Sequence, residues 1–237
     1  DPLMKKLHDT KINNEKLKIF FPLVDHSFIT TNPDCLNISK KYIKSVHFLM
    51  TPVDKNIECF DVYNHNPEND LFYAMSHGVN RATLKTGKID NRVIFLKKLI
   101  NKIKDIKYDF YGFEKQEPVW GNEFYKSLLN SKMALNLSRG EPTKYYSSNR
   151  IASLMGNGLL VFIDKKVKMD DFFNSKEIIS YNNIDDLADK IKFYSRKDKL
   201  RISIAKNGKD KYFKLFNETR VSKYLIDTSL GKNTSLF

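Results

Sequence analysis

This sequence of 237 residues has no long apolar run, no CxxC pair of cysteines and no signal-peptide pattern at its first residues. The longest wholly apolar run is Leu159–Ile163, and because a membrane-spanning helix needs about 20 apolar residues, no transmembrane segment is predicted. The chain begins at Asp1 without the charged-then-apolar pattern of a signal peptide, from which we expect a fragment or a processed chain. Cys35 and Cys59 have neither CxxC nor metal-site spacing, so we expect two half-buried thiols in a reducing compartment.

Common motifs for nucleotide hydrolysis, dinucleotide binding and zinc or serine hydrolysis are also missing. The sequence contains no GxxxxGK[ST], GxGxxG, HExxH or GxSxG. The acidic pairs Asp170–Asp171 and Asp185–Asp186 fall at expected helix starts, so no carboxylate pair at a strand end is predicted to hold a metal against a diphosphate. What remains is a phosphate site made of cationic side chains and helix N-termini, without a metal or a further cofactor.

Acidic residues are too few to balance the basic ones, which leaves a formal net charge of +13. Such an excess attracts polyanions, but only 7 of the 41 basic residues are Arg, and nucleic-acid recognition favours the forked guanidinium group. Nucleic acid is therefore disfavoured as a partner, while weak contact with an anionic membrane surface stays open. We expect a cytoplasmic protein whose only membrane contact would be peripheral, at the inner face.

Hydrophobic residues at 41% and aromatic residues at 13% predict a folded chain, and apolar strand-like runs alternate with helical patterns after about residue 69. The expected strands are 70–76, 108–113, 133–138, 159–164 and 177–181, and the expected helices are 91–106, 122–131, 149–155 and 185–195, the last capped by Asp185. This alternation predicts an α/β fold in which a Rossmann-like parallel sheet carries helices on both faces.

The first 65 residues have a different pattern, with expected strands at 16–23, 26–34 and 45–54 and a polar, Pro-containing segment at 64–70. We therefore predict three parts: a partial amino-terminal domain over 1–65, the Rossmann-like domain over 66–216, and a carboxy-terminal helix and tail over 217–237.

Ligands of parallel sheets bind outside the carboxyl ends of the strands, where two loops of this chain, 76–88 and 138–150, are markedly polar. In the second loop Ser147, Ser148 and Asn149 can cap a helix or donate to an anion, while Arg150 and Lys144 can pair with phosphate oxygens. The alternative is a plain N-cap followed by a solvated arginine. Because the positive end of a helix disfavours arginine, the position of Arg150 indicates a negative partner.

The other candidates on this rim carry weaker signals. His77, Gly78 and Arg81 follow an expected strand and could approach a diphosphate, or they could form a surface turn. Glu141 could accept from a ribose or sugar hydroxyl, or balance Arg139. For Trp120, which could flank a base, burial in the core is the favoured prediction.

The segment 149–217, from "NRIASLMGNGLLVFID" to "AKNGKDKYFKLFN", resembles the carboxy-terminal domain of GT-B glycosyltransferases, in the glycosyl transferase family 1 or CgeB-like group. The segment 72–92 is similar to the first strand and loop of that domain, and 27–61 to the end of the acceptor domain. The resemblance implies a glycosyltransferase of cell-envelope polysaccharide synthesis that transfers a sugar from a nucleotide-sugar to a glycan or lipid acceptor. It implies no metal requirement.

The resemblance also implies residue roles. The diphosphate would lie at Ser148–Arg150, with Arg150, Arg81 and Lys144 stabilising it as it leaves. The expected donor-binding residues are His77, Gly78, Arg139, Glu141, Tyr146, Ser147, Ser148, Asn149 and Ser153. Many relatives have Glu where this chain has Ser153, in an R-x-x-E pattern, and the amino-terminal part is short. These two features favour one alternative, a non-catalytic nucleotide- or glycan-binding module on a degenerate transferase scaffold. The other alternative is a basic nucleic-acid-binding protein.

Overall fold

The computed structural model describes residues 18–35, 42–76 and 89–236. Its centre is a parallel sheet of five strands in the order β4-β3-β5-β6-β7. The strands are β3 (Asn69–Ala74), β4 (Tyr108–Tyr111), β5 (Ser131–Asn136), β6 (Leu160–Asp164) and β7 (Ile179–Tyr181). The expected strand 159–164 is confirmed as β6, which lies between two parallel neighbours with its first four residues buried.

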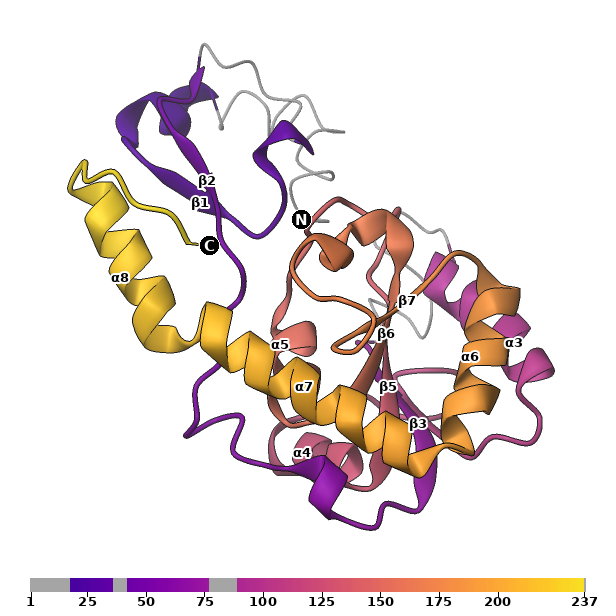
Figure 1. Cartoon of the computed structure of the whole chain (residues 1–237). Coiled ribbons are helices and arrows are strands. Elements are labelled where there is room, and N and C mark those ends of the chain that lie inside the picture. The colour runs from indigo at the N-terminus through magenta and orange to yellow at the C-terminus, as the bar shows by residue number, and fades with distance from the viewer. Residues whose placement is uncertain (1–17, 36–41, 77–88, 237) are drawn as a thin grey trace.

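Helices cover both faces of this sheet, which confirms the predicted Rossmann-like architecture (Figure 1). They are α3 (Asn91–Lys102), α4 (Gly121–Leu129), α5 (Asn149–Gly156), α6 (Ile184–Ser195), α7 (Asp198–Phe216) and α8 (Glu218–Ser229). Leu96 of α3 and Leu187 of α6 belong to the core on one face. Leu128 of α4, Leu154 of α5 and Phe216 of α7 belong to the core on the other.

The order of the strands creates a crevice between β3 and β5. The chain passes from β3 to β4 at one edge of the sheet and then returns past β3 to β5. Because the chain leaves these two neighbouring strands toward opposite edges, the loops after them separate, and ligands of open α/β sheets bind at such a point. The segments after Ala74 and Asn136 are therefore where a site is expected.

The amino-terminal part forms a separate sheet of two parallel strands, β1 (Ser27–Ile29) and β2 (Val46–Phe48). It lies beside α8, where the rings of Phe28 and Tyr224 meet edge to face at 6.0 Å (Figure 1). Farther along, the backbone N–H of Val53 donates to the carbonyl of Phe216 at 3.0 Å. The boundary between 65 and 66 stays a prediction, but residues before it pack into the same core as α5 and α7.

Two local predictions are wrong. The described part of the expected strand 16–23 is helical, because Pro22 has no N–H for a sheet ladder and occupies the first turn of a 3₁₀ helix. The cap of α6 is Asn183, whose side chain accepts from the backbone N–H groups of Asp185 and Asp186. Short 3₁₀ helices lie at Phe21–Leu23, Pro33–Cys35, Val62–Asn64, Lys165–Val167 and Met169–Asp171.

Cys35 and Cys59 are exposed, so the expectation of half-buried thiols is wrong; both lie in irregular or 3₁₀ segments outside the main sheet. Within the described ranges, no helix is both long and apolar enough to cross a bilayer.

Gly112 fixes the turn that follows β4, and its replacement provides a test of this fold. Its φ is +70°, and a Cβ atom there would lie 1.7 Å from the carbonyl oxygen of Met75. We expect Gly112→Ala to lower the free energy of unfolding by about 2–5 kcal/mol, from the left-handed backbone and from the clash. Urea unfolding followed by circular dichroism measures this change.

Gly121 provides the matched control. Its φ is +54°, but a Cβ atom there meets nothing within 4 Å. Gly121→Ala should therefore lower the free energy of unfolding by about 1–2 kcal/mol, the cost of a left-handed backbone alone. Equal losses for the two variants would contradict the close approach of Gly112 to Met75.

Candidate active site

Arg150, at the start of α5, reaches across the carboxyl end of β5. Its Nη1 atom donates to the carbonyl oxygen of Leu137 at 2.6 Å, and its guanidinium lies over the ring of Tyr73, 5.3 Å from the centroid. Ser148 is the N-cap residue, with an extended backbone (φ −139°) and no side-chain hydrogen bond to the helix. The guanidinium of Arg150 thus lies against the ends of β3 and β5, beside the positive end of α5. This arrangement favours an anion there.

A second arginine, Arg92, lies near the start of α3 and is buried against Asp90. The contact is bidentate: Nε lies 3.0 Å from Oδ1, and Nη2 lies 2.7 Å from Oδ2. Both side chains are 5% exposed. Arg139 approaches the same carboxylate, with its Nε 3.3 Å from Oδ2. Asp90 therefore holds two arginines together at this edge of the sheet.

The Asp90–Arg92 pair stays ionised despite its burial. Burial alone would raise the pKa of Asp90, but hydrogen bonds and charge from Arg92, together with the charge of Arg139, leave it below its ordinary value. Burial alone would lower the pKa of Arg92, but Asp90 outweighs it and the pKa of Arg92 is raised. Both members of the pair consequently stay charged at physiological pH and hold each other in place.

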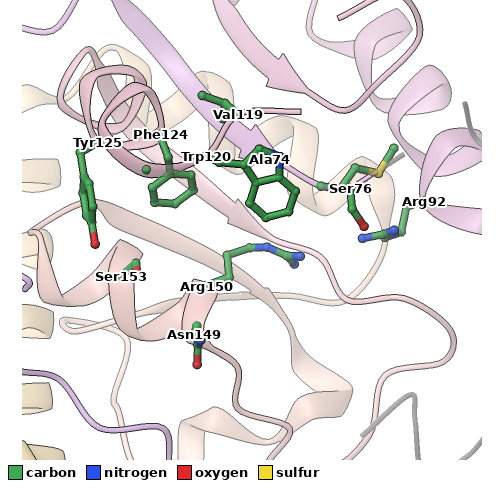
Figure 2. A pocket seen from close by; sticks show the side chains of 12 residues that line it. Ala74, Ser76, Arg92, Val119, Trp120, Phe124, Tyr125, Asn149, Arg150 and Ser153 are labelled. Atoms are coloured by element: carbon green, nitrogen blue, oxygen red, sulfur yellow. The ribbon is translucent and has the colours of Figure 1, made fainter. Parts of the chain in front are cut away.

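A cavity of about 420 Å³ opens between the end of β3 and the starts of α4 and α5 (Figure 2). We call it the aromatic cavity; its lining includes Trp120, Phe124, Tyr125, Arg92, Arg150 and Ser153. Trp120 is 70% exposed, so its predicted burial in the core is wrong. It lies just before Gly121, outside the packed face of α4, with its ring at the cavity (Figure 2).

A smaller cavity of about 200 Å³ adjoins the first. We call it the arginine cavity; it is lined by Arg92, Arg139, Arg150, Ser138, Tyr146 and Ser148, and it shares Ser76, Arg92 and Arg150 with the aromatic cavity. Three guanidinium groups against one carboxylate, Asp90, leave a local excess of positive charge. Such an arrangement fits a multiply charged anion.

The structure brings together most of the predicted residues of the second polar loop. Asn149, Arg150 and Ser153 line the aromatic cavity, and Arg139, Tyr146 and Ser148 line the arginine cavity. Glu141 lines a third cavity, described below. His77, Gly78 and Arg81 lie outside the described residues.

Two predicted residues are not at these cavities. The prediction of Ser147 as a donor contact is corrected: it is buried, its N–H donates to the carbonyl of Thr30, and its Oγ accepts from the N–H of Thr51 at 3.0 Å. Lys144 lines none of the three cavities; its Nζ lies over the ring of Tyr145, 4.7 Å from the centroid. Both side chains are used in packing around the loop.

Arg92 was missed by the sequence analysis. Its only local signal is the spacing of Asp90 and Arg92 at the start of a helix, after a polar loop. Across residues 18–35, 42–76 and 89–236, no three His, Cys, Asp or Glu side chains gather as metal ligands. Independence from a metal nevertheless stays a prediction.

Comparison with known families supports the resemblance. Residues 92–227 match the family model described as glycosyl transferase-like, which is more than half of the chain. The chain belongs to the glycosyl transferase-like family. A search of curated protein sequences finds no match to it.

Solved structures show the fold of this glycosyl transferase-like chain. TarM of S. aureus matches with a TM-score of 0.65 at 14% identity, over 92% of this chain and 46% of TarM. HepE of Anabaena, solved with UDP and glucose, matches with a TM-score of 0.61 at 9% identity, over 95% of this chain and 69% of HepE. An α-glucosyltransferase solved with UDP and a 13-mer DNA matches with a TM-score of 0.63 at 14% identity, over 90% of this chain and 67% of the enzyme.

These likenesses confirm the GT-B fold of the glycosyl transferase-like chain. The chain spans about half the length of TarM, at 46%, and 63% of the sucrose-phosphate synthase of Thermosynechococcus elongatus, another match. Membership of the CgeB-like group stays a prediction.

Proposed function

We propose that the chain is the donor-binding part of a glycosyltransferase that transfers a sugar from a nucleotide-sugar to an acceptor, without a required metal. The observation that carries this proposal is the pair of adjoining cavities at the point between β3 and β5 where the sheet changes direction. The first offers aromatic rings, the second offers three arginines, and Arg92 and Arg150 belong to both. A nucleoside diphosphate has an aromatic base that suits the first cavity, joined through its ribose to a multiply charged anion that suits the second.

In this proposal the arginine cavity does the chemical work. When the sugar leaves, negative charge grows on the diphosphate, and cations already fixed in place stabilise it without reorganising. Arg92 is fixed by Asp90, and Arg150 is fixed by the carbonyl of Leu137. Lys144 lines none of the three cavities, and Arg81 is not among the described residues. We therefore assign the central role to Arg150, with Arg92 beside it.

The aromatic cavity would hold the nucleoside. Trp120 presents an open indole face to a base, and Tyr125 of α4 and Ser153 of α5 line the same cavity (Figure 2). Many relatives have a Glu in place of Ser153 that contacts the ribose. We propose that Ser153, Asn149 and the hydroxyl of Tyr125 take over the contacts to the ribose in this chain.

Nucleotide release tests the activity. The chain is incubated with a panel of UDP-, GDP- and dTDP-sugars, with and without EDTA, and free nucleoside diphosphate is measured. Release that EDTA does not slow supports metal-independent transfer or hydrolysis. Binding without release supports the non-catalytic module instead, and the absence of binding to every donor overturns both.

The acceptor is proposed to be a glycan or a lipid of the cell envelope, reached from the cytoplasmic side. The net charge of +13 supports weak contact with an anionic membrane. Nucleic acid remains the disfavoured partner. A mobility shift with duplex DNA that persists above roughly 200 mM salt would make nucleic acid the favoured partner, because purely electrostatic binding falls steeply with salt.

Trp120→Ala tests the placement of the base. Because stacking of one base on an aromatic ring contributes about 1–3 kcal/mol, we expect the variant to bind UDP about 5- to 150-fold more weakly by calorimetry. Its thermal stability should hardly change, since the indole is 70% exposed. Trp120→Phe keeps a ring and should retain most of the affinity. UDP affinity that does not fall in Trp120→Ala would place the base elsewhere.

A further inference from the structure

A third cavity, of about 140 Å³, lies at the carboxyl ends of β5, β6 and β7, beside the start of α3. We call it the polar cavity; its lining includes Asn136, Glu141, Asp164, Tyr181, Phe95 and Arg92. It shares Arg92 and Ser138 with the arginine cavity. The three cavities therefore follow one another along the same edge of the sheet.

Two residues that line the polar cavity each have a buried polar atom without a partner. Asn136 is 5% exposed and Tyr181 is 1% exposed, yet neither Oδ1 of Asn136 nor the hydroxyl of Tyr181 has a hydrogen bond within the described structure. Buried polar side chains are nearly always paired, because a buried group without a hydrogen bond loses its contacts with water and gains nothing in return. Two such atoms around one cavity indicate a partner that enters it.

The chemistry of the lining restricts that partner. Asp164 and Glu141 are carboxylates, and Asp164 uses one oxygen for the N–H of Lys166, so the lining favours hydroxyl donors and repels another phosphate. Burial, helped by the charge of Asp164, raises the pKa of Tyr181, which therefore keeps its proton and can donate. The ring of Phe95 provides an apolar surface. A neutral ring with several hydroxyl groups satisfies all of these conditions.

The volume agrees with one ring. A single water needs about 10–15 Å³ of such space, so 140 Å³ is far more than one water requires. We propose that the polar cavity binds the sugar ring of the nucleotide-sugar, and that Asn136 and Tyr181 read its hydroxyl groups. This inference rests on the proposed function. It places nucleoside, diphosphate and sugar in three successive cavities, in the order in which they are joined in the donor.

Tyr181→Phe tests this assignment because it removes only the unpaired hydroxyl. UDP, GDP and dTDP are each compared by calorimetry with their own sugar conjugates, in the wild-type chain and in the variant. We expect at least one conjugate to bind the wild type more tightly than its parent diphosphate. In Tyr181→Phe that conjugate should lose about 3- to 10-fold in affinity, the size of one hydrogen bond, while the parent diphosphate stays within 2-fold. Asn136→Leu should act in the same direction.

Tyr212→Phe is the matched control. Tyr212 is a fully buried tyrosine of α7 whose hydroxyl donates to the carbonyl of Thr51 at 2.8 Å, and it lines none of the three cavities. Its loss should lower stability and leave the ratio of conjugate to diphosphate affinity unchanged. Tyr181→Phe should not lower stability, because the hydroxyl it removes is unpaired.

The outcomes separate this inference from the proposed function. If diphosphates bind but no conjugate binds more tightly, or if Tyr181→Phe weakens diphosphate and conjugate equally, the polar cavity holds only water and the inference is overturned while the proposed function stands. If no diphosphate binds the wild-type chain, the proposed function fails and the inference fails with it.

Discussion

Replacing Asp90 with alanine lowers the free energy of unfolding by about 3–5 kcal/mol, because it leaves the guanidinium of Arg92 buried without its counter-ion. Both side chains are only 5% exposed, so water cannot replace the lost contacts. The variant also loses the cap of α3, since Asp90 accepts from the backbone N–H of Arg92. Urea unfolding at neutral pH measures the loss.

Asp185→Ala is the control for Asp90→Ala. Asp185 also pairs with a cation at a helix, Lys102, but its side chain is 70% exposed. Its removal should cost less than about 1 kcal/mol, as for other surface ion pairs. If Asp90→Ala lowered the free energy of unfolding as little as Asp185→Ala, water would have access to the Asp90–Arg92 pair, contrary to the burial of both side chains.

The pH dependence of the wild-type chain gives a second check on the same pair. The pKa of Asp90 is lowered from 3.8 in the folded state, so its contribution is complete above that value and is lost as pH falls through the lower folded value. The difference in stability between wild type and Asp90→Ala should therefore narrow below about pH 4. A difference that stays constant down to pH 2 would contradict the charged pairing.

Arg150→Ala weakens binding of nucleoside diphosphate by about 1.5–3 kcal/mol, roughly 10- to 150-fold, which is the range for a hydrogen bond to a charged group. The side chain borders both the aromatic and the arginine cavities and is held in place by Leu137 and Tyr73. The variant forfeits these contacts as well, so its folding must be verified by thermal unfolding before its affinity is compared. Calorimetry with UDP measures the effect.

Arg196→Ala controls for the loss of one positive charge. Arg196 lies after α6, pairs with Asp105 at 2.7 Å and is 70% exposed, outside the three cavities. UDP affinity should be the same in this variant as in the wild type. If Arg196→Ala weakened UDP binding as much as Arg150→Ala, net charge rather than a built site would explain the affinity.

The main sheet could be predicted because local and tertiary requirements agree there. A strand that lies between parallel neighbours is apolar on both faces, so β6 stands out as an uninterrupted apolar run with a glycine turn before it. Likewise, the position of Arg150 at the positive end of α5 signals a negative partner from sequence alone. These features depend on residues close together in the chain.

The rest depends on contacts between distant segments. Arg92 becomes part of the site only because the order of the strands brings the start of α3 beside the end of β5, and no local pattern records this proximity. A large aromatic side chain such as Trp120 is usually buried, so its sequence position alone predicts burial, and only the structure shows that it borders a cavity. Asn136 and Tyr181 each fit an ordinary buried strand, and only their shared cavity distinguishes them.

Ser147 joins the site to the amino-terminal part of the chain. Its N–H is bonded to Thr30 and its hydroxyl to Thr51, one residue before the cap of the helix that carries Arg150. By thermodynamic linkage, a ligand that favours this position of α5 must favour the docking of those amino-terminal residues by the same free energy, and their docking must strengthen the ligand equally. A ligand bound beside Arg150 and the docking of the amino-terminal part would therefore strengthen each other.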